Sequence, residues 1–104
     1  MDSKCTYIIG FDICDNDPLR DAFVQKLKEE LNAQRINQSC YKVNLDKNVS
    51  EMQDCLLSIC KTCASEYGKF HESDFVKLYC SAYLADYHAV NKHEIYEYNI
   101  NLLK

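Results

Sequence analysis

Glycine and proline are scarce in this 104-residue chain, which has two glycines and one proline. So few turn formers leave little material for long loops or a disordered linker, and the length suits one domain with a single core. No apolar run approaches the roughly 20 residues that a membrane-spanning helix needs. The first residues also lack the basic start and small-residue cleavage site of a signal peptide. We therefore expect one cytoplasmic domain with no membrane contact.

Positive charge is in deficit as well, with 12 Lys and Arg residues against 16 Asp and Glu and a net charge of −4. Proteins that coat nucleic acid without sequence preference need clustered Lys and Arg, and here these residues are scattered. The two glycines, Gly10 and Gly68, also exclude a glycine-rich phosphate loop. These absences argue against the most common kinds of nucleotide-binding and nucleic-acid-coating protein.

Cysteine, in contrast, is abundant and odd in number, with seven residues. Four of the cysteines fall in strand-like runs and three on a helical pattern, which argues against a disulfide framework. Cys60 and Cys63 form a C-x-x-C motif, with Cys55 before it and His71 after it. A zinc site would need four such ligands, usually from turns, whereas this motif lies on an apolar helical stripe. We expect reduced core thiols and no zinc.

The run at residues 5–14 is almost wholly apolar and carries one carboxylate, Asp12, close to its end. Its β-branched and aromatic composition predicts a buried central strand. Asp17 is a good N-cap and Pro18 a good first helical residue for the segment that follows. Apolar residues then recur at every fourth position and predict an amphipathic helix over about 18–33.

Residues 35–45 have a strand composition with a polar middle, which predicts two short strands or one strand bent at Gln38 and Ser39. A second amphipathic helix should follow, because Ser50 and Gln53 have the spacing of a capping box. Gly68 is its expected C-terminal stop.

Two further segments alternate between apolar and polar residues, at 74–84 and at 95–102. The first predicts a half-buried strand, and the second predicts a strand or, as the competing interpretation, a short helix. The resulting order is strand, helix, strand pair, helix, strand and a terminal element. It predicts an α+β, ferredoxin-like split βαβ sandwich over residues 1–90, with both helices on one sheet face. The tail at 91–104 is expected to contribute to dimerisation.

Three segments together resemble a known family. They are Tyr7-Ile-Ile-Gly-Phe-Asp12-Ile, Arg35-Ile-x-x-Ser39-Cys-Tyr41 and Asp74-Phe-Val-Lys-Leu-Tyr79. Their order and spacing are similar to those of the small CRISPR-associated spacer-acquisition protein, also called the CRISPR-associated endoribonuclease. The relatives of that family include the virulence-associated protein D ribonucleases. The resemblance covers roughly residues 5–84 and is more specific for the fold than for the activity.

The resemblance implies a ferredoxin-like homodimer whose sheets face each other, with a role in antiviral defence. Asp12 matches the family's strand-end carboxylate in the dimer cleft, where two copies share Mg²⁺ or Mn²⁺ for phosphodiester hydrolysis. Ser39 and Tyr41 match a serine and an aromatic position of the family. One departure is the acidic stretch at 15–21, where the family usually has basic residues and only Arg20 remains. That departure bears on nucleic-acid contact more than on the fold.

Asp12 therefore has two interpretations. As the catalytic and metal-binding residue it would hold a hard divalent cation, which needs a symmetric pair of carboxylates because each chain supplies one. As a structural residue it would accept hydrogen bonds from backbone amides at the start of the first helix.

Tyrosines crowd the last third of the chain, and base stacking or a protein interface would account for them. The acidic balance and a sheet face left without helices favour the interface. Four residues are expected to form it: Tyr79, Tyr83, Tyr96 and Tyr98. Two hypotheses follow, a homodimeric metal-dependent nuclease acting on nucleic acid or a non-catalytic interaction module that binds a protein partner.

Overall fold

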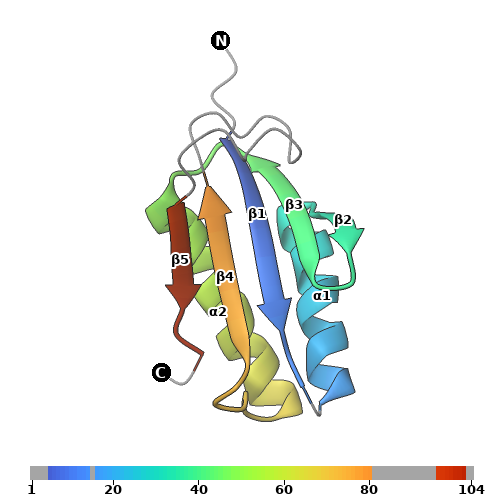
Figure 1. Cartoon of the computed structure of the whole chain (residues 1–104). Helices are drawn as coiled ribbons and strands as arrows, with labels where there is room; N and C mark the ends of the chain where they lie inside the picture. Colours follow the sequence, from blue (N-terminus) through green and yellow to red (C-terminus); the bar gives the residue numbers. More distant parts are fainter. Residues whose placement is uncertain (1–4, 15, 81–95, 103–104) are drawn as a thin grey trace.

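The computed structural model describes residues 5–14, 16–80 and 96–102, which form one five-stranded sheet and two helices. The elements in chain order are β1 (Cys5–Asp12), α1 (Asp17–Leu31), β2 (Gln34–Asn37), β3 (Cys40–Leu45), α2 (Val49–Tyr67), β4 (Phe75–Cys80) and β5 (Tyr96–Ile100). The strands lie in the order β2-β3-β1-β4-β5, and each pair of neighbours is antiparallel (Figure 1). This arrangement confirms the predicted α+β, ferredoxin-like fold with an extra strand. Neither described helix combines the length and apolar character needed to cross a bilayer.

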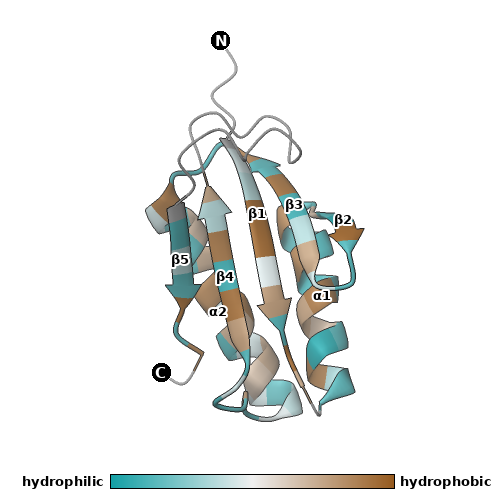
Figure 2. Ribbon diagram, in the orientation of Figure 1, coloured by the Kyte–Doolittle hydropathy of each residue, from teal (hydrophilic) through white to brown (hydrophobic). Residues whose placement is uncertain are grey.

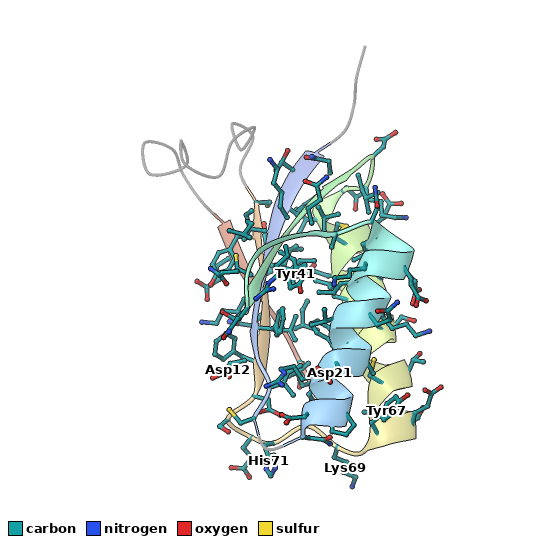
Figure 3. The ribbon with its side chains drawn as sticks, turned by 90° about the vertical axis from the view of Figure 1, so that its right-hand side faces the viewer. Asp12, Asp21, Tyr41, Tyr67, Lys69 and His71 are labelled. Atoms are coloured by element: carbon teal, nitrogen blue, oxygen red, sulfur yellow. The ribbon has the colours of Figure 1, made fainter. Side chains whose placement is uncertain are left out.

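Both helices cover the same face of the sheet, as the edge-on view in Figure 3 shows. We call the opposite side the open face, and it carries Ile8, Asp12, Phe75, Lys77 and Tyr79. Successive strand residues point to opposite sides of a sheet, so hydrophobic and hydrophilic segments alternate along β4 (Figure 2). The core therefore lies between the sheet and the two helices.

The central strand β1 supplies the middle of this core. The side chains of Tyr7, Ile9 and Phe11 point towards the helices and are almost wholly buried. The Phe11 ring packs edge-on against Phe23 of α1, with centroids 5.1 Å apart, and stacks on Tyr41 of β3 at 5.9 Å. Aromatic pairs of this geometry contribute beyond the area they bury. Strand β1, which ends in Asp12, is therefore packed against both α1 and the neighbouring strand β3.

The first helix begins one residue earlier than predicted, because its N-cap is Asn16 and not Asp17. The Asn16 Oδ1 atom accepts a hydrogen bond from the Leu19 amide at 3.1 Å, and its Nδ2 atom donates to the Tyr67 carbonyl at 2.9 Å. An amide side chain can satisfy both groups, whereas a carboxylate could not donate the second bond. At the other end, Asn32 takes up a left-handed conformation (φ 52°) and stops the helix at Leu31.

The second helix is capped two residues earlier than predicted. Its capping box consists of Asn48 and Glu51 and not of Ser50 and Gln53. The two bonds are reciprocal, since the Glu51 amide donates to Asn48 Oδ1 at 2.9 Å and the Asn48 amide donates to Glu51 Oε1 at 3.1 Å. Gly68 ends the helix with a positive φ of 106°, as predicted.

The tail forms a strand and not a short helix, because β5 pairs with β4 along its whole length. Ile100 lies opposite Val76 and packs into the core, so β5 contributes to the core between the sheet and the helices. The alternating segment at 74–84 forms β4 as far as Cys80, and its remaining positions lie outside the described residues. The predicted domain boundary at residue 90 lies outside them too.

The two cysteines of the C-x-x-C motif are buried in the core, as the apolar stripe predicted. Cys60 and Cys63 are 2% and 1% exposed. Burial raises the pKa of the Cys60 thiol to about 12, and the neighbouring Cys63 adds to this shift. Burial also raises the pKa of Cys63. Both groups are therefore neutral thiols over the ordinary pH range.

Candidate functional site

A hollow of about 720 Å³ lies between α1 and the hairpin formed by β2 and β3. The residues of this hollow that carry polar groups are Asp12, Arg20, Asp21, Gln25, Arg35, Gln38, Ser39 and Tyr41. They come from β1, α1 and the hairpin, so the hollow exists only in the folded chain. It is the place where the structure brings together the residues singled out by the family resemblance.

The hairpin turn is what places Ser39 beside the end of β1. The Asn37 Oδ1 atom accepts a hydrogen bond from the Ser39 amide at 2.9 Å, which closes the turn at Gln38 and Ser39. The Ser39 carbonyl in turn accepts a hydrogen bond from the Phe11 amide at 3.0 Å. Because Phe11 precedes Asp12, this bond fixes the backbone next to the carboxylate.

Tyr41 and Ser39 contribute to the hollow in different ways. Tyr41 is 3% exposed and lies between the sheet and α1 (Figure 3), so its stacked ring forms part of the inner wall. Ser39 is exposed, and its hydroxyl group donates to Asn37 Oδ1 at 3.4 Å, a long contact. Ser39 therefore keeps a hydroxyl group within reach of a ligand, and Tyr41 shapes the cavity.

The two arginines of the hollow differ in their partners. Arg20 forms ion pairs with Asp17 at 3.1 Å and with Asp21 at 3.9 Å. Arg35 is exposed on the edge strand β2 and forms no ion pair within the described part of the chain. Arg35 lies opposite Tyr41 in the strand register. The guanidinium of Arg35 is thus the cation of the hollow that is not already neutralised by a described carboxylate.

Asp12 is exposed and points away from the helices (Figure 3). Its Oδ1 atom accepts a hydrogen bond from the Cys14 thiol at 3.4 Å. A thiol is a weak donor, so this contact holds the carboxylate loosely. At the start of the first helix, the amide of Leu19 donates to Asn16 and not to Asp12. Backbone amides at this end of the molecule are bound by another carboxylate.

That carboxylate is Asp74, which the sequence interpretation missed. It is 9% exposed, and its two oxygens accept hydrogen bonds from the backbone amides of Cys14 at 2.9 Å and His71 at 2.8 Å. The Asp74 amide also donates to the His71 carbonyl at 3.1 Å. An Asp in a turn before a strand commonly bonds to nearby backbone, which was a usable signal for the His71 contact. No local pattern indicates the bond to Cys14, which lies 60 positions away.

The described residues of a single chain do not fit a resident divalent cation. Across residues 5–14, 16–80 and 96–102, no three His, Cys, Asp or Glu side chains gather closely enough to hold a metal. Asp12 supplies one carboxylate, with a thiol beside it. Mg²⁺ and Mn²⁺ prefer oxygen ligands. A cation at Asp12 would therefore need further oxygens from a second copy of the chain.

Of the four expected interface tyrosines, the two whose side chains the structure describes, Tyr79 and Tyr98, lie on opposite faces of the sheet. Tyr79 lies on the open face, where its ring covers Gly10; a Cβ atom added there would come within 3.3 Å of the ring. Tyr98 lies opposite Leu78 and packs against the core, so it faces the helices. Tyr96 lies in β5 opposite Cys80, and Tyr83 is outside the described residues.

Comparison with known proteins does not assign the chain to a family. No family model matches it, and no curated protein matches it significantly. The resemblance of the three segments to the CRISPR-associated endoribonucleases therefore remains a prediction.

Proposed function

We propose that the chain is a homodimeric, nuclease-like protein that binds the phosphodiester backbone of a nucleic acid in the hollow beside Asp12. One observation carries this proposal: Asp12, Ser39 and Tyr41, which come from distant parts of the sequence, line the same hollow as Arg20 and Arg35. Guanidinium groups bind phosphate in a fixed, two-pronged geometry, and hydroxyl groups add donors. The hollow is partly open to solvent, which suits an extended chain better than a buried small molecule.

Arg35 is the residue proposed to bind the phosphate, since Arg20 is already paired with two aspartates. The Asp12 carboxylate at the edge of the hollow would repel a phosphate, so cleavage there would need a cation bound to that carboxylate. Mg²⁺ or Mn²⁺ held by Asp12 from two copies would supply the Lewis-acid chemistry of phosphodiester hydrolysis. Each chain therefore supplies one carboxylate, that of Asp12. The hairpin and α1 supply the hydrogen-bond donors that line the hollow.

The proposal is tested by binding and cleavage of a short labelled oligonucleotide, with Arg35→Gln and Asp12→Asn as variants. Without divalent cations, Arg35→Gln should weaken binding by roughly tenfold or more, because a charge-assisted hydrogen bond contributes about 1.5–3 kcal/mol. Asp12→Asn should bind at least as well as wild type but lose cleavage in Mg²⁺ or Mn²⁺. Lys61→Gln, an exposed change in α2 that does not line the hollow, is the matched control. Absence of binding by wild type at high micromolar concentration would refute the proposal.

A second candidate, a non-catalytic dimeric scaffold, is favoured by the open face. Phe75 is 38% exposed there, and Tyr79 lies on the same face of β4 four positions further along the strand. Aromatic residues are enriched in the centres of protein interfaces. Sedimentation should show a dimer at micromolar concentration that Tyr79→Glu weakens and Tyr67→Glu does not. A wild-type monomer would exclude the dimer, and a dimer without oligonucleotide binding would favour the scaffold over the nuclease.

A further inference from the structure

The open face places an exposed aromatic ring directly beside Asp12. Asp12 on β1 and Phe75 on β4 are opposite each other in the antiparallel register, and both side chains point away from the helices. Side chains paired in this way lie about 4.5–5.5 Å apart at their Cβ atoms. Phe75 is one of two large hydrophobic residues that are exposed within the described chain, and the other, Tyr67, lies at the end of α2.

The ring of Phe75 is held in place by its neighbours. The Lys77 ammonium lies 5.0 Å from the ring centroid, within the range of a cation–π contact. Lys77 is itself fixed by an ion pair with Glu97 of β5 at 3.1 Å. This chain of contacts ties the ring to the sheet and leaves part of its surface in solvent. A fixed, partly exposed ring loses little entropy when a flat ligand stacks on it.

We propose that Phe75 stacks an unpaired base of a single-stranded nucleic acid whose backbone crosses Asp12 into the hollow; this inference rests on the proposed function. Aromatic residues bind bases of single strands without sequence preference, because every base has a π face. A base inside a duplex is already stacked on both sides and offers no face to Phe75. The site should therefore prefer single strands to duplexes.

The negative net charge limits how much phosphate contacts can contribute to the binding of such a strand. A chain with a charge of −4 and one unpaired guanidinium in the hollow gains little from phosphate contacts alone. Stacking adds affinity that does not depend on counterion release. The binding of a single strand should accordingly depend only weakly on salt, with a slope of about −0.7 in log affinity against log salt for each phosphate contacted.

The chain contains no tryptophan, so Phe75→Trp would carry a unique fluorescent reporter at the proposed stacking position. Addition of a short oligothymidylate should quench this fluorescence, since a stacked base contacts the indole. Tyr67→Trp is the matched control, because it places the reporter at an equally exposed aromatic position on α2 and should not respond. Ribose 5-phosphate, which has no base, should leave both signals unchanged.

A second measurement uses Phe75→Leu, which keeps an apolar side chain of similar size. Its affinity for oligothymidylate should fall by about 5- to 150-fold, the range measured when stacking aromatics are removed. Its affinity for an abasic strand of the same length should match that of wild type. Thermal melts of both variants check that the fold is intact.

The outcomes separate this inference from the proposed function. If Arg35→Gln loses oligonucleotide binding while Phe75→Trp shows no quenching and Phe75→Leu binds normally, stacking is refuted and phosphate binding stands. Duplex binding as tight as that of single strands would also refute stacking. If Phe75→Leu turns a dimer into a monomer without changing oligonucleotide affinity, a second copy of the chain covers the ring instead. Failure of wild type to bind any strand would overturn both proposals.

Discussion

Replacement of Asp74 by asparagine tests whether one buried carboxylate holds the end of the molecule that carries the candidate site. The two Asp74 oxygens accept hydrogen bonds from the amides of Cys14 and His71 and so join the loop after β1 to the loop after α2. Asparagine has nearly the same shape but only one acceptor oxygen. Its NH₂ group would face an N–H donor, and the remaining bond would lose its charge assistance.

The expected cost follows from these two bonds. A hydrogen bond to a charged group contributes about 1.5–3 kcal/mol, and an unsatisfied buried donor costs about 1–3 kcal/mol. With one bond lost and the other weakened, we expect Asp74→Asn to lower the free energy of unfolding by about 2–4 kcal/mol. Domains of this size have a total of about 5–15 kcal/mol. The melting temperature should fall by roughly 8–32 °C, at about 4–8 °C for each kcal/mol.

Urea and thermal denaturation followed by circular dichroism would measure this change, with Asp12→Asn as the matched control. Asp12 is exposed, and its carboxylate accepts a long hydrogen bond from a thiol, so its replacement should change stability by no more than about 0.5 kcal/mol. A melting temperature of Asp74→Asn within a few degrees of wild type would refute this account. So would an Asp12→Asn variant that is as destabilised as Asp74→Asn.

The remaining predictions concern the buried thiols. Cys60 and Cys63 should react with a thiol reagent only as fast as the chain unfolds, because both side chains are buried. Burial also raises the pKa of both thiols, that of Cys60 to about 12. Fast labelling of either thiol in folded protein would contradict this prediction. The unfolded chain has a thiol pKa of about 8.5, so the contribution of Cys60 to stability is complete below that pH and is lost as the pH rises towards 12. Urea denaturation of wild type should therefore show a loss of stability from pH 8 to pH 10 that is smaller in Cys60→Ala.

The long periodic elements were predictable because their hydrophobic spacing repeats many times. The two helices and the central strand appear where the stripe of every fourth residue and the buried run indicated. The helix starts were less predictable, because several residues able to cap stand side by side. Asn16 is chosen over Asp17 since it also bonds the Tyr67 carbonyl, a contact between the ends of two helices. Capping rules consider only neighbouring residues in the sequence, so they cannot predict that contact.

The candidate site was predictable only in part, and for a related reason. Asp12 stood out because a carboxylate in an apolar strand needs an explanation. Asp74 and Arg35 acquire their significance from the strand order, which places β3 and β4 on either side of β1. The structure of the terminal segment was likewise ambiguous from the sequence. Alternating apolar and polar residues over only five positions fit a strand or a short helix, and the pairing with β4 identifies the strand.

The backbone around Asp12 is fixed on both sides, although its side chain makes only a long contact with the Cys14 thiol. The amide before it, that of Phe11, donates to the Ser39 carbonyl, and the amide two positions after it, that of Cys14, donates to Asp74. A carboxylate needed for the fold would itself accept such bonds, as Asp74 does. A carboxylate needed for a ligand must be positioned by its neighbours and left available, which is the arrangement found at Asp12. Asp74→Asn should therefore lower both stability and oligonucleotide affinity, whereas Asp12→Asn should abolish cleavage without lowering either.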